Sequence, residues 1–388
     1  MGLFKLISKK RYDVCIVHLA DARYYPFFHR QAASLVEKKF SVAVVSWENV
    51  KGKGDPKWPG IDVYPIYIPG KSIKGKFFFI RYFFSCLFLL CRLQARLYQA
   101  VDPPALIPSR IAAFFNKARY SYFSLEYFQG VEQIVGKPFV RMIWYLLEGF
   151  GLCNAKNVAA VCQTTERFLK DEFKLSKTCT ILNVPQSTEY ADQGENLLRK
   201  RLGLGKSVPL AVYKGKLMDN RGLIPFIKAM APFTGIHFAC IGNGELLPTL
   251  ASLASELGCA DRVHFLDEIQ SSDFARYLKD ADIGHVIHEN RGVNMMVTLP
   301  SKLFDYIHAT IPVIASDGPE ISRIVRKWNV GWLVSPSSIE SIQNALADFL
   351  KTYGKQTEIK KNCAEAAKQL CWENEKKHYL EFIDQSLA

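Results

Sequence analysis

Residues 285–320 have the sequence HVIHENRGVNMMVTLPSKLFDYIHATIPVIASDGPE, and the order of apolar and polar runs around this stretch decides the predicted fold. The pattern predicts a buried strand at 283–287, a polar loop, a short helix and a second buried strand at 313–315. Pro312 marks the end of the helix, because a residue that precedes a proline is pushed out of the helical region. The polar loop therefore leads from a buried strand directly to the N-terminus of a helix.

That helix N-terminus, Pro300-Ser301-Lys302, is a candidate anion site. Free backbone N–H groups and the helix dipole favour an anion there, and Lys302 adds a full positive charge. Asp305 lies on much the same face, about 6 Å further along the helix axis. An anion site next to a carboxylate suits a diphosphate beside a sugar diol, which is a nucleotide. A strand–loop–helix–strand unit that binds no ligand, with its Asp and Lys side chains in solvent, has the same sequence pattern. This stretch alone therefore leaves open whether it is a nucleotide site or such a unit.

The composition is that of a globular chain with an excess of positive charge. The 388 residues suffice for two domains, and a hydrophobic content of 49% excludes a disordered chain. The formal charge of +13 points to an anionic partner, which is a phosphorylated ligand, a membrane surface or nucleic acid. The ten cysteines form no CxxC pair and no zinc-site spacing. We therefore expect reduced thiols in a cytoplasmic protein without a secretory signal.

Buried strands alternate with helices along both halves of the sequence. Apolar runs at 13–19 and 40–47 flank a helical run, and the same alternation restarts at residue 210. This order predicts an α/β fold with doubly wound parallel sheets in two Rossmann-like domains, 1–190 and 206–350. The polar run between the two domains is the predicted linker. We expect the lysine-rich helices of 351–388 to pack back on the first domain.

Residues 71–100 form the most unusual segment, KSIKGKFFFIRYFFSCLFLLCRLQARLYQA. Its apolar run, 77–90, contains one charge and is flanked by lysines and arginines, and it is shorter than the roughly 20 residues of a transmembrane helix. It is either a buried helix of the first domain or a helix in the membrane interface with its cations on anionic lipid. We favour the second interpretation, because a core helix does not need so many flanking cations.

Two loops that follow predicted strands in the second half contain candidate phosphate ligands. In the first loop, Gly215 and Lys216 are followed by Arg221, and two cations five residues apart are able to clamp both phosphates of a diphosphate and neutralise a departing one. In the second, Gly242-Asn243-Gly244 ends a strand and opens a helix, so a ligand is able to approach the backbone closely. The third glycine of a dinucleotide-binding motif is missing, which argues against NAD.

Two further pairs resemble metal ligands, and we interpret both as structural. His285 and His288 are three positions apart, and an odd offset along a strand places two side chains on opposite faces. Asp280 and Asp282 form a DxD pair where a helix gives way to a buried strand. We therefore expect no metal site.

Taken together, the motifs of residues 208–350 resemble the C-terminal domain of the retaining GT-B glycosyltransferases of family four, the glycosyl transferases group 1 type. Residues 215–222, GKLMDNRG, are similar to the GRLxxxKG motif of that group, whose two cations contact the donor diphosphate. The turn 242–244 is similar to its GxG turn. The resemblance implies that Lys216 and Arg221 are diphosphate ligands, and that the fold is GT-B, with two Rossmann-like domains facing across a cleft.

The resemblance also assigns residues to the donor sugar nucleotide. Asp305 falls at the second glutamate of the paired-glutamate motif of the family, which holds the ribose hydroxyls. Val297 occupies the position of the first glutamate, so that glutamate is missing, as in the sub-group with the sequence NKLFEY. Residues 290–294, with Asn294 at their end, are the expected substitutes in contacts to the donor hexose.

The first half resembles the family more loosely. Asp21-x-Arg23 followed by Arg30-Gln31-Ala32 is similar to the opening DxR and (R/K)(E/Q)A motifs of the family. Residues 102–106, DPPAL, resemble its HDLPAL segment without the histidine, and residues 125–127, LEY, resemble its HEY segment, again without the histidine. Asp102 and Glu126 are therefore the remaining candidates for catalytic groups in the expected cleft.

The predicted activity is transfer of a sugar from a nucleotide diphosphate donor, with retention, to a lipid-linked or polysaccharide acceptor of the cell envelope. The donor is a co-substrate of UDP or GDP type, and we expect no separate cofactor. We expect the protein to lie on the cytoplasmic face of the cell membrane. Two alternatives remain open: a GT-B protein without transferase activity, as an inactive partner subunit or a nucleotide-sugar epimerase, and a basic membrane-surface binding protein. Nucleic acid is not an expected partner, because the cations are spread along the chain without a recognisable nucleic-acid motif.

Overall fold

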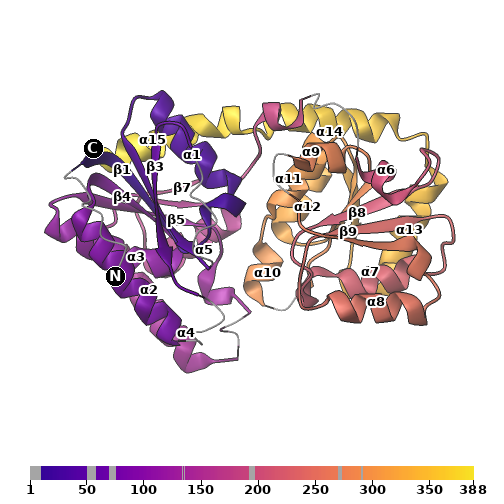
Figure 1. Cartoon of the computed structure of the whole chain (residues 1–388), viewed down its shortest axis with the longest axis horizontal. Coiled ribbons are helices and arrows are strands. Elements are labelled where there is room, and N and C mark those ends of the chain that lie inside the picture. Colours follow the sequence, from indigo (N-terminus) through magenta and orange to yellow (C-terminus); the bar gives the residue numbers. More distant parts are fainter. Residues whose placement is uncertain are drawn as a thin grey trace. The chain divides into compact units, whose positions relative to one another are not determined.

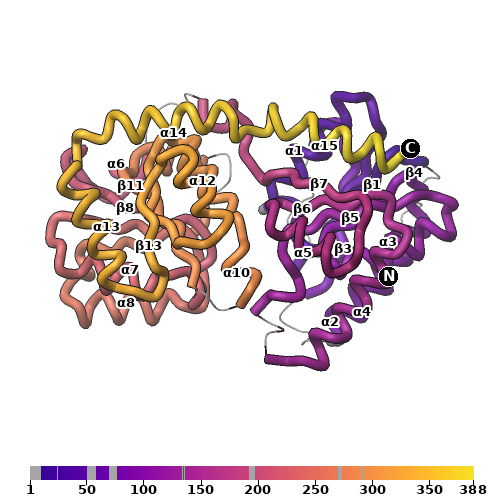
Figure 2. The backbone as a smooth tube through the Cα atoms, turned by 180° about the vertical axis from the view of Figure 1, so that it is seen from behind, coloured from indigo at the N-terminus to yellow at the C-terminus, as the bar shows by residue number. Residues whose placement is uncertain are grey.

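The structure is a computed structural model that describes residues 10–49, 58–69, 76–132, 134, 136–191, 197–269, 273–289 and 292–388. It divides into two compact units, one of Met1–Asn183 with Glu375–Ala388 and one of Val184–Asn374. Each unit contains a parallel sheet with helices packed on its faces (Figures 1 and 2). The prediction that the whole tail 351–388 packs on the first domain is wrong in part. Helix α14 (Thr357–Gln369) packs on helices of the second unit, and the chain joins the first unit only at Glu375.

The first unit is built on a seven-stranded parallel sheet in the order β3-β2-β1-β4-β5-β6-β7. The strand order reverses between β1 and β4, which confirms the doubly wound topology that the alternation of strands and helices predicts. The strands are β1 Arg11–His18, β2 Val42–Glu48, β3 Ile61–Tyr67, β4 Gln94–Val101, β5 Arg119–Ser124, β6 Val158–Ala160 and β7 Thr178–Thr180. The helices are α1 Pro26–Glu37, α2 Lys76–Arg92, α3 Asp102–Phe115, α4 Pro138–Leu152, α5 Gln163–Phe173 and, from Glu375 on, α15 (Trp372–Leu387), with short 3-10 turns at Ala22–Tyr24 and Phe128–Gly130.

Strand β4 corrects the interpretation of 71–100 as one membrane-interface segment. Helix α2 ends at Arg92, and after one residue the chain enters β4, which pairs with β1 and β5 at the centre of the sheet. Leu97, Tyr98 and Gln99 are fully buried there. Residues 97–100 are therefore unavailable to lipid, because this part of a central strand is buried on both faces.

Helix α2 itself combines features of both interpretations. Tyr82, Cys86 and Leu90 recur every four residues, so they share one face of the helix, and this face is buried in the core of the first unit. On the opposite side, Phe84 and Phe88 are exposed. The helix is therefore a core helix on one face and presents aromatic side chains to its surroundings on the other. Residues 71–75, with two of the flanking lysines, lie outside the described part of the chain.

A buried carboxyl group fixes the inner side of helix α4. Glu148 is fully buried and accepts hydrogen bonds from the Tyr122 hydroxyl (2.8 Å) and from Nε2 of Gln129 (2.8 Å). Burial raises the pKa of Glu148 to about 7. This shift makes the first unit sensitive to pH, because the folded protein keeps a proton that the unfolded chain releases.

The sign of the effect follows from the raised pKa. The contribution of Glu148 to the free energy of unfolding is fully present below its unfolded pKa, near 4.5, and is lost as the pH rises through about 7. The full loss is about 3 kcal/mol. We expect Glu148→Gln to remove this component, so that the difference in stability between variant and wild type changes between pH 4.5 and 7. Urea unfolding at a series of pH values measures it, and parallel stability profiles for the two proteins would contradict the assignment.

The second unit contains a six-stranded parallel sheet in the order β10-β9-β8-β11-β12-β13. Its strands are β8 Leu210–Lys214, β9 His237–Ile241, β10 Val263–Leu266, β11 Ile283–Val286, β12 Val313–Ser316 and β13 Gly331–Val334. Its helices are α6 Leu198–Leu202, α7 Leu223–Met230, α8 Leu247–Glu256, α9 Phe274–Leu278, α10 Val293–Val297, α11 Ser301–His308, α12 Pro319–Trp328, α13 Ile339–Lys351 and α14, with 3-10 turns at Ser187–Tyr190, Asp219–Arg221 and Ala260–Arg262. The strand order reverses between β8 and β11, so this sheet is doubly wound as well. The sequence analysis did not predict α12 and β13.

The DxD pair is structural, as predicted from its position. Arg199 of α6 pairs with Asp282 at 2.5 Å, and the Asp280 carboxylate accepts a hydrogen bond from the Arg199 backbone N–H at 2.6 Å. Asp282 also accepts from the backbone N–H of Leu210, the first residue of β8. The two carboxylates thus fasten the start of the second unit to its central strand.

Candidate functional site

The candidate site lies at the carboxyl ends of β8 and β11, where the strand order of the second sheet reverses. Open α/β sheets bind ligands at this position, because the loops that follow the two strands turn to opposite sides and leave a crevice. Lys214 ends β8, the loop 215–222 follows it, and His288 follows β11. Helix α11 contacts β11 and brings its first turn to the same edge.

A buried ion pair joins β8 to α11. The Lys214 ammonium lies 2.6 Å from Oδ2 of Asp305, which is 8% exposed, and 3.5 Å from the centroid of the Phe274 ring. Oδ1 of Asp305 accepts a hydrogen bond from the Tyr190 hydroxyl at 2.9 Å. The sequence analysis singled out Asp305 but missed Lys214 and Tyr190. The position of Lys214 at the end of a strand does not show that its side chain turns toward α11, and Tyr190, 115 residues from Asp305, carries no sequence signal either.

Lys302 brings a second cation to this edge. Its ammonium lies 3.9 Å from the centroid of the Tyr213 ring, and a Cβ atom added to Gly215 would lie 3.5 Å from it. Burial lowers the pKa of Lys302 well below its usual value, and the positive charges of Arg221 and Lys214 lower it further. Lys302 in the first turn of α11 therefore lies within electrostatic range of Arg221, in the loop after β8, and of Lys214 at the end of β8.

Arg221 contacts a histidine that follows β11. Its Nη1 lies 3.3 Å from Nε2 of His288, and burial together with the charges of Lys302 and Arg221 lowers the pKa of His288 far below its usual value. Nε2 of His285 lies 3.3 Å from the carbonyl oxygen of Gly222. The two histidines thus hold the loop 215–222 against β11, and this arrangement supports the structural interpretation of the pair.

The cluster of Lys214, Arg221, Lys302 and Asp305 contains three basic side chains and one carboxylate. Like charges that repel one another in a partly buried place lower the stability of the empty protein. A diphosphate carries the negative charge that balances this excess, and charge-assisted hydrogen bonds to phosphate are among the stronger polar contacts. The arrangement is therefore suited to a phosphorylated ligand.

Lys216 differs from the other cations. Its side chain is exposed, and its backbone carbonyl accepts a hydrogen bond from the Tyr213 hydroxyl at 2.6 Å. Within the described part of the chain, no contact joins its ammonium to the cluster. Ser301 is exposed at the first position of α11, and Pro300 forms the N-cap in an extended conformation. The N–H groups at the start of this helix have no side-chain cap.

The glycine turn packs against the loop that follows β8. Gly242 has φ +141°, and a Cβ atom there would lie 2.2 Å from the carbonyl oxygen of Gly215. A Cβ atom on Gly244 would lie 2.1 Å from the carbonyl oxygen of Leu217. The loop after β9 therefore packs directly on the loop after β8, and hydrogen bonds between the loops, including Leu217 N–H to the Asn243 carbonyl (3.0 Å), fix it there. The glycines permit this close packing, and the role of Gly242, Asn243 and Gly244 in donor binding stays a prediction.

The region expected to contact the donor hexose is described in part. Asn294 is buried in the short helix α10, and Val297 at its end is buried as well. Asn290 lies outside the described residues. The carbonyl oxygen of Met296 lies 2.8 Å from the position that a Cβ atom of Gly318 would take, so α10 packs against the start of α12.

Asp102 and Glu126 lie in the first unit, at the ends of β4 and β5. The Asp102 carboxylate accepts a hydrogen bond from the backbone N–H of Leu125 at 2.9 Å, and its backbone has the left-handed φ of +58°. Burial raises the pKa of Asp102, and the negative charge of Glu126 raises it further. Glu126 is exposed. The structure thus brings these two carboxyl groups together, with Asp102 already engaged in holding the turn after β5.

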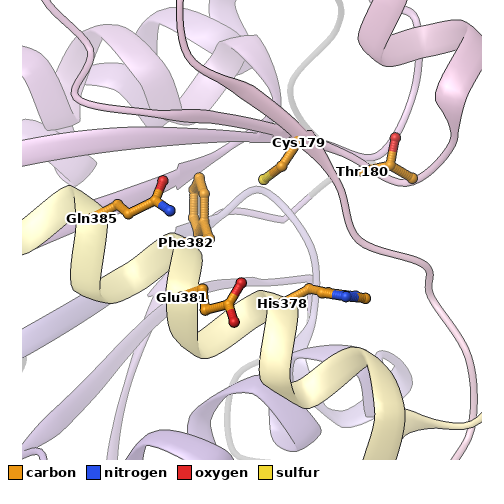
Figure 3. A pocket seen from close by; sticks show the side chains of 6 residues that line it. All are labelled: Cys179, Thr180, His378, Glu381, Phe382 and Gln385. Carbon is orange, nitrogen blue, oxygen red and sulfur yellow. The ribbon is translucent and has the colours of Figure 1, made fainter.

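Two pockets occur elsewhere in the described residues. In the first unit, α15 packs against β7, and Figure 3 shows the side chains that line the hollow between them, among them Cys179, His378 and Glu381. Burial and neighbouring carboxylates raise the pKa of Cys179 to about 12, which makes its thiol a poor nucleophile. In the second unit, a pocket at the start of α12 contains Arg323 and Arg326, whose guanidinium groups pair with Glu320 and Asp317. Both pockets are weaker candidates for an anion than the cluster at β8.

Residues 195–370 match the family model described as Glycosyl transferases group 1. This match includes every residue of the cation cluster, the loop 215–222 and the glycine turn 242–244. The GDP-mannose-dependent alpha-(1-6)-phosphatidylinositol monomannoside mannosyltransferase of Mycobacterium tuberculosis is 27% identical over 158 residues. That match covers 39% of this chain and 41% of the relative. The corresponding protein of Mycolicibacterium smegmatis is 26% identical over 160 residues, with the same coverage.

Solved structures match over nearly the whole chain. Sucrose-phosphate synthase from Thermosynechococcus elongatus has a TM-score of 0.80 at 16% identity, covering 96% of this chain and 98% of the other. The Anabaena protein HepE, solved with UDP and glucose, has a TM-score of 0.74 at 14% identity, covering 96% and 99%. At such identities the likeness shows the fold, which is that of the GT-B glycosyltransferases. Residues 195–370 thus match the model of the glycosyl transferases group 1 family, in a chain with two Rossmann-like α/β domains.

Proposed function

We propose that this protein is a glycosyltransferase that moves a sugar from a nucleotide diphosphate donor, of UDP or GDP type, to an acceptor hydroxyl. The observation that carries the proposal is the cluster of Lys214, Arg221, Lys302 and Asp305 at the switch point of the second sheet. It gathers positive charge beside a carboxylate, within a domain of a sugar-transferring family. The nucleotide sugar is a co-substrate, and the proposal includes no separate cofactor or metal.

In this proposal the donor diphosphate lies between the loop after β8 and the start of α11. Arg221 and Lys302 bind its oxygens, the exposed Lys216 closes on it from the loop, and the backbone N–H groups of Ser301 and Lys302, which follow the N-cap Pro300, complete the contacts. Asp305 accepts hydrogen bonds from the ribose hydroxyls. Its two oxygens have lone pairs beyond those that Lys214 and Tyr190 occupy, so it is able to accept further bonds.

The chemistry follows from where charge develops. As the bond between the anomeric carbon and the diphosphate oxygen breaks, its electron pair passes to the departing diphosphate, which Lys216 and Arg221 stabilise. With retention, the acceptor hydroxyl attacks from the face that the diphosphate leaves, and its proton passes to a diphosphate oxygen. This route needs no strong protein base. In this proposal Asp102 and Glu126 position the acceptor.

We propose a lipid-linked or polysaccharide acceptor of the cell envelope and a location on the cytoplasmic face of the cell membrane. The exposed aromatic side of α2 and the net charge of +13 support it. The mannosyltransferases that match part of the chain act, by their names, on a phosphatidylinositol mannoside. None of the helices within the described residues combines the length and apolar character needed to cross a bilayer.

The donor is identified most directly by thermal unfolding with nucleoside diphosphates. A ligand present at 100 times its Kd adds roughly 2.7 kcal/mol to the free energy of unfolding. We expect UDP or GDP to raise the Tm, and the nucleoside without phosphates to have no effect. Hydrolysis of the corresponding nucleotide sugars then shows whether the chain is a transferase. Stabilisation without any turnover would favour an inactive partner subunit, and no stabilisation by any nucleotide would refute the proposal.

A further inference from the structure

Exposed apolar side chains are concentrated on two helices of the first unit. Twenty large apolar side chains are exposed among the described residues, and thirteen of them lie on α2 and α4. We call these thirteen the apolar face: Phe77, Phe79, Ile80, Phe84 and Phe88 of α2, and Phe139, Val140, Met142, Ile143, Tyr145, Leu146, Leu147 and Phe150 of α4. Soluble monomers rarely expose so large a contiguous apolar surface, so a partner is expected there.

The two helices meet, so their exposed sides form one surface. The ring of Phe79 on α2 lies 5.4 Å from that of Trp144 on α4, in a T-shaped contact. Both helices pack on α3, and the three lie together along one side of the unit (Figures 1 and 2). The sequence analysis singled out α2 alone, although α4 contributes the larger share of the apolar face.

Helix α4 is held firmly from its inner side. Glu148 is bound to Tyr122 and Gln129, and a Cβ atom on Gly151 would lie 2.5 Å from the side chain of Leu106, so α3 and α4 approach closely. The guanidinium of Arg110 lies 3.9 Å from the centroid of the Phe150 ring. These contacts fix which side of α4 faces inward. The exposed side is therefore a defined feature of the fold.

The charges around the apolar face are positive. Arg81 and Arg92 of α2, Arg141 of α4 and Lys137 at the start of α4 are exposed. Helices α2 and α4 together contain one acidic residue, Glu148, which is buried. An apolar surface with basic and no exposed acidic residues is complementary to anionic lipid headgroups over an acyl layer. A symmetric contact with a second copy of the chain would instead bring like charges together.

We propose that the apolar face docks on a bilayer that contains anionic lipids, with α4 and α2 lying in the interface and their arginines and lysines on the headgroups. The inference rests on the proposed function in one respect, because a lipid-linked acceptor explains why the enzyme needs a membrane. The partner is the lipid surface itself, and the side chains of α4 are the principal apolar contacts.

The test uses flotation of the full chain with vesicles of phosphatidylcholine alone and with phosphatidylglycerol added. The variant Phe139→Ser/Leu146→Ser removes two side chains that are 68% and 60% exposed. Its matched control, Leu257→Ser/Ile339→Ser, removes two exposed apolar side chains of the second unit, 39% and 38% exposed. We expect the wild type and the control to bind the anionic vesicles. The α4 variant should bind at least about tenfold more weakly.

A charge variant tests the headgroup contacts separately. Arg81→Gln/Arg141→Gln should lose roughly fivefold in binding for each arginine, and added salt should weaken the wild type in the same direction. The proposal would be overturned if the wild type does not bind anionic vesicles, or if the α4 variant binds them as tightly as the wild type does. A third result would also overturn it: light scattering shows that the wild type is a dimer, and Phe139→Ser/Leu146→Ser dissociates this dimer but leaves vesicle binding unchanged.

The outcome is separable from that of the proposed function. Lys216→Ala/Arg221→Ala changes only the candidate diphosphate ligands, so we expect it to float with anionic vesicles as the wild type does. The α4 variant should hydrolyse a water-soluble nucleotide sugar at the wild-type rate. A chain that binds vesicles but hydrolyses no donor supports the docking surface and refutes the transferase. A chain that hydrolyses the donor without binding vesicles supports the transferase and refutes the docking surface.

Discussion

Replacing Arg221 by alanine is expected to lower sugar transfer by about 10²–10³-fold, the typical effect of removing one preorganised group that stabilises developing charge. The guanidinium of Arg221 lies at the cation cluster and repels the Lys302 ammonium in the empty protein. Its loss therefore removes a repulsion as well as a ligand. We expect the variant to gain less stability from the nucleoside diphosphate than the wild type does.

Lys216→Ala is expected to reduce transfer by a similar factor without any effect on the stability of the empty protein. The Lys216 side chain is exposed, so nothing in the fold depends on its ammonium. Because the stabilised charge develops as the donor bond breaks, kcat should fall more than the KM for donor rises. Steady-state transfer or donor hydrolysis measures both constants.

Lys228→Ala is the matched control for these two variants. Lys228 is an exposed cation of α7 in the same unit and takes no part in the cluster. It should leave transfer unchanged, which shows that general loss of positive charge is not the cause. Transfer by Arg221→Ala and Lys216→Ala at the rate of Lys228→Ala would refute the assignment of the diphosphate ligands.

The second large effect concerns the ion pair between Lys214 and Asp305. Their side chains are 15% and 12% exposed, so the pair is largely buried. Asp305→Asn leaves the Lys214 ammonium without its carboxylate, and breaking one side of a buried pair costs about 3 kcal/mol or more. Asp305→Asn/Lys214→Met removes both charges, and we expect it to recover most of the lost stability. Urea unfolding of the three proteins measures this recovery.

The same variants separate the structural role of Asp305 from its proposed contact with ribose. The wild type should bind the ribonucleoside diphosphate more tightly than the 2′-deoxy form. The 2′-deoxy form lacks one of the two ribose hydroxyl groups that donate hydrogen bonds to the Asp305 carboxylate. The double variant should bind both forms equally, although its fold is restored. Titration calorimetry with the two ligands decides it. An undiminished preference for ribose in the double variant would show that Asp305 is purely structural.

The sequence predicted the fold best where residue type alone determines the local backbone structure. Alternating strands and helices predicted two doubly wound sheets, and both strand orders confirm it. The residues before and after Pro312 divide between α11 and β12 as expected. Strand β4 was missed because its sequence, QARLYQAV, continues an apolar and basic run that is also typical of a helix. Only pairing with β1 and β5 makes it a strand, and such tertiary context overrides local propensity.

The site was predictable in its location but less so in its partners. Lys302 and Arg221 could be selected because each follows a strand or opens a helix. Lys214 was passed over, since a terminal strand residue gives no sign that its side chain turns toward α11. The glycines 242–244 were correctly identified as a close backbone approach, and the sequence alone does not show that the approaching group is the loop after β8.

A crystal structure with the bound nucleoside diphosphate tests the central claim most directly. We predict that oxygens of the two phosphates lie about 3 Å from the Arg221 guanidinium, the Lys302 ammonium and the backbone N–H of Ser301, with the ribose hydroxyls on Asp305. A diphosphate bound elsewhere, with Arg221 and Lys302 in contact with water alone, would contradict the account.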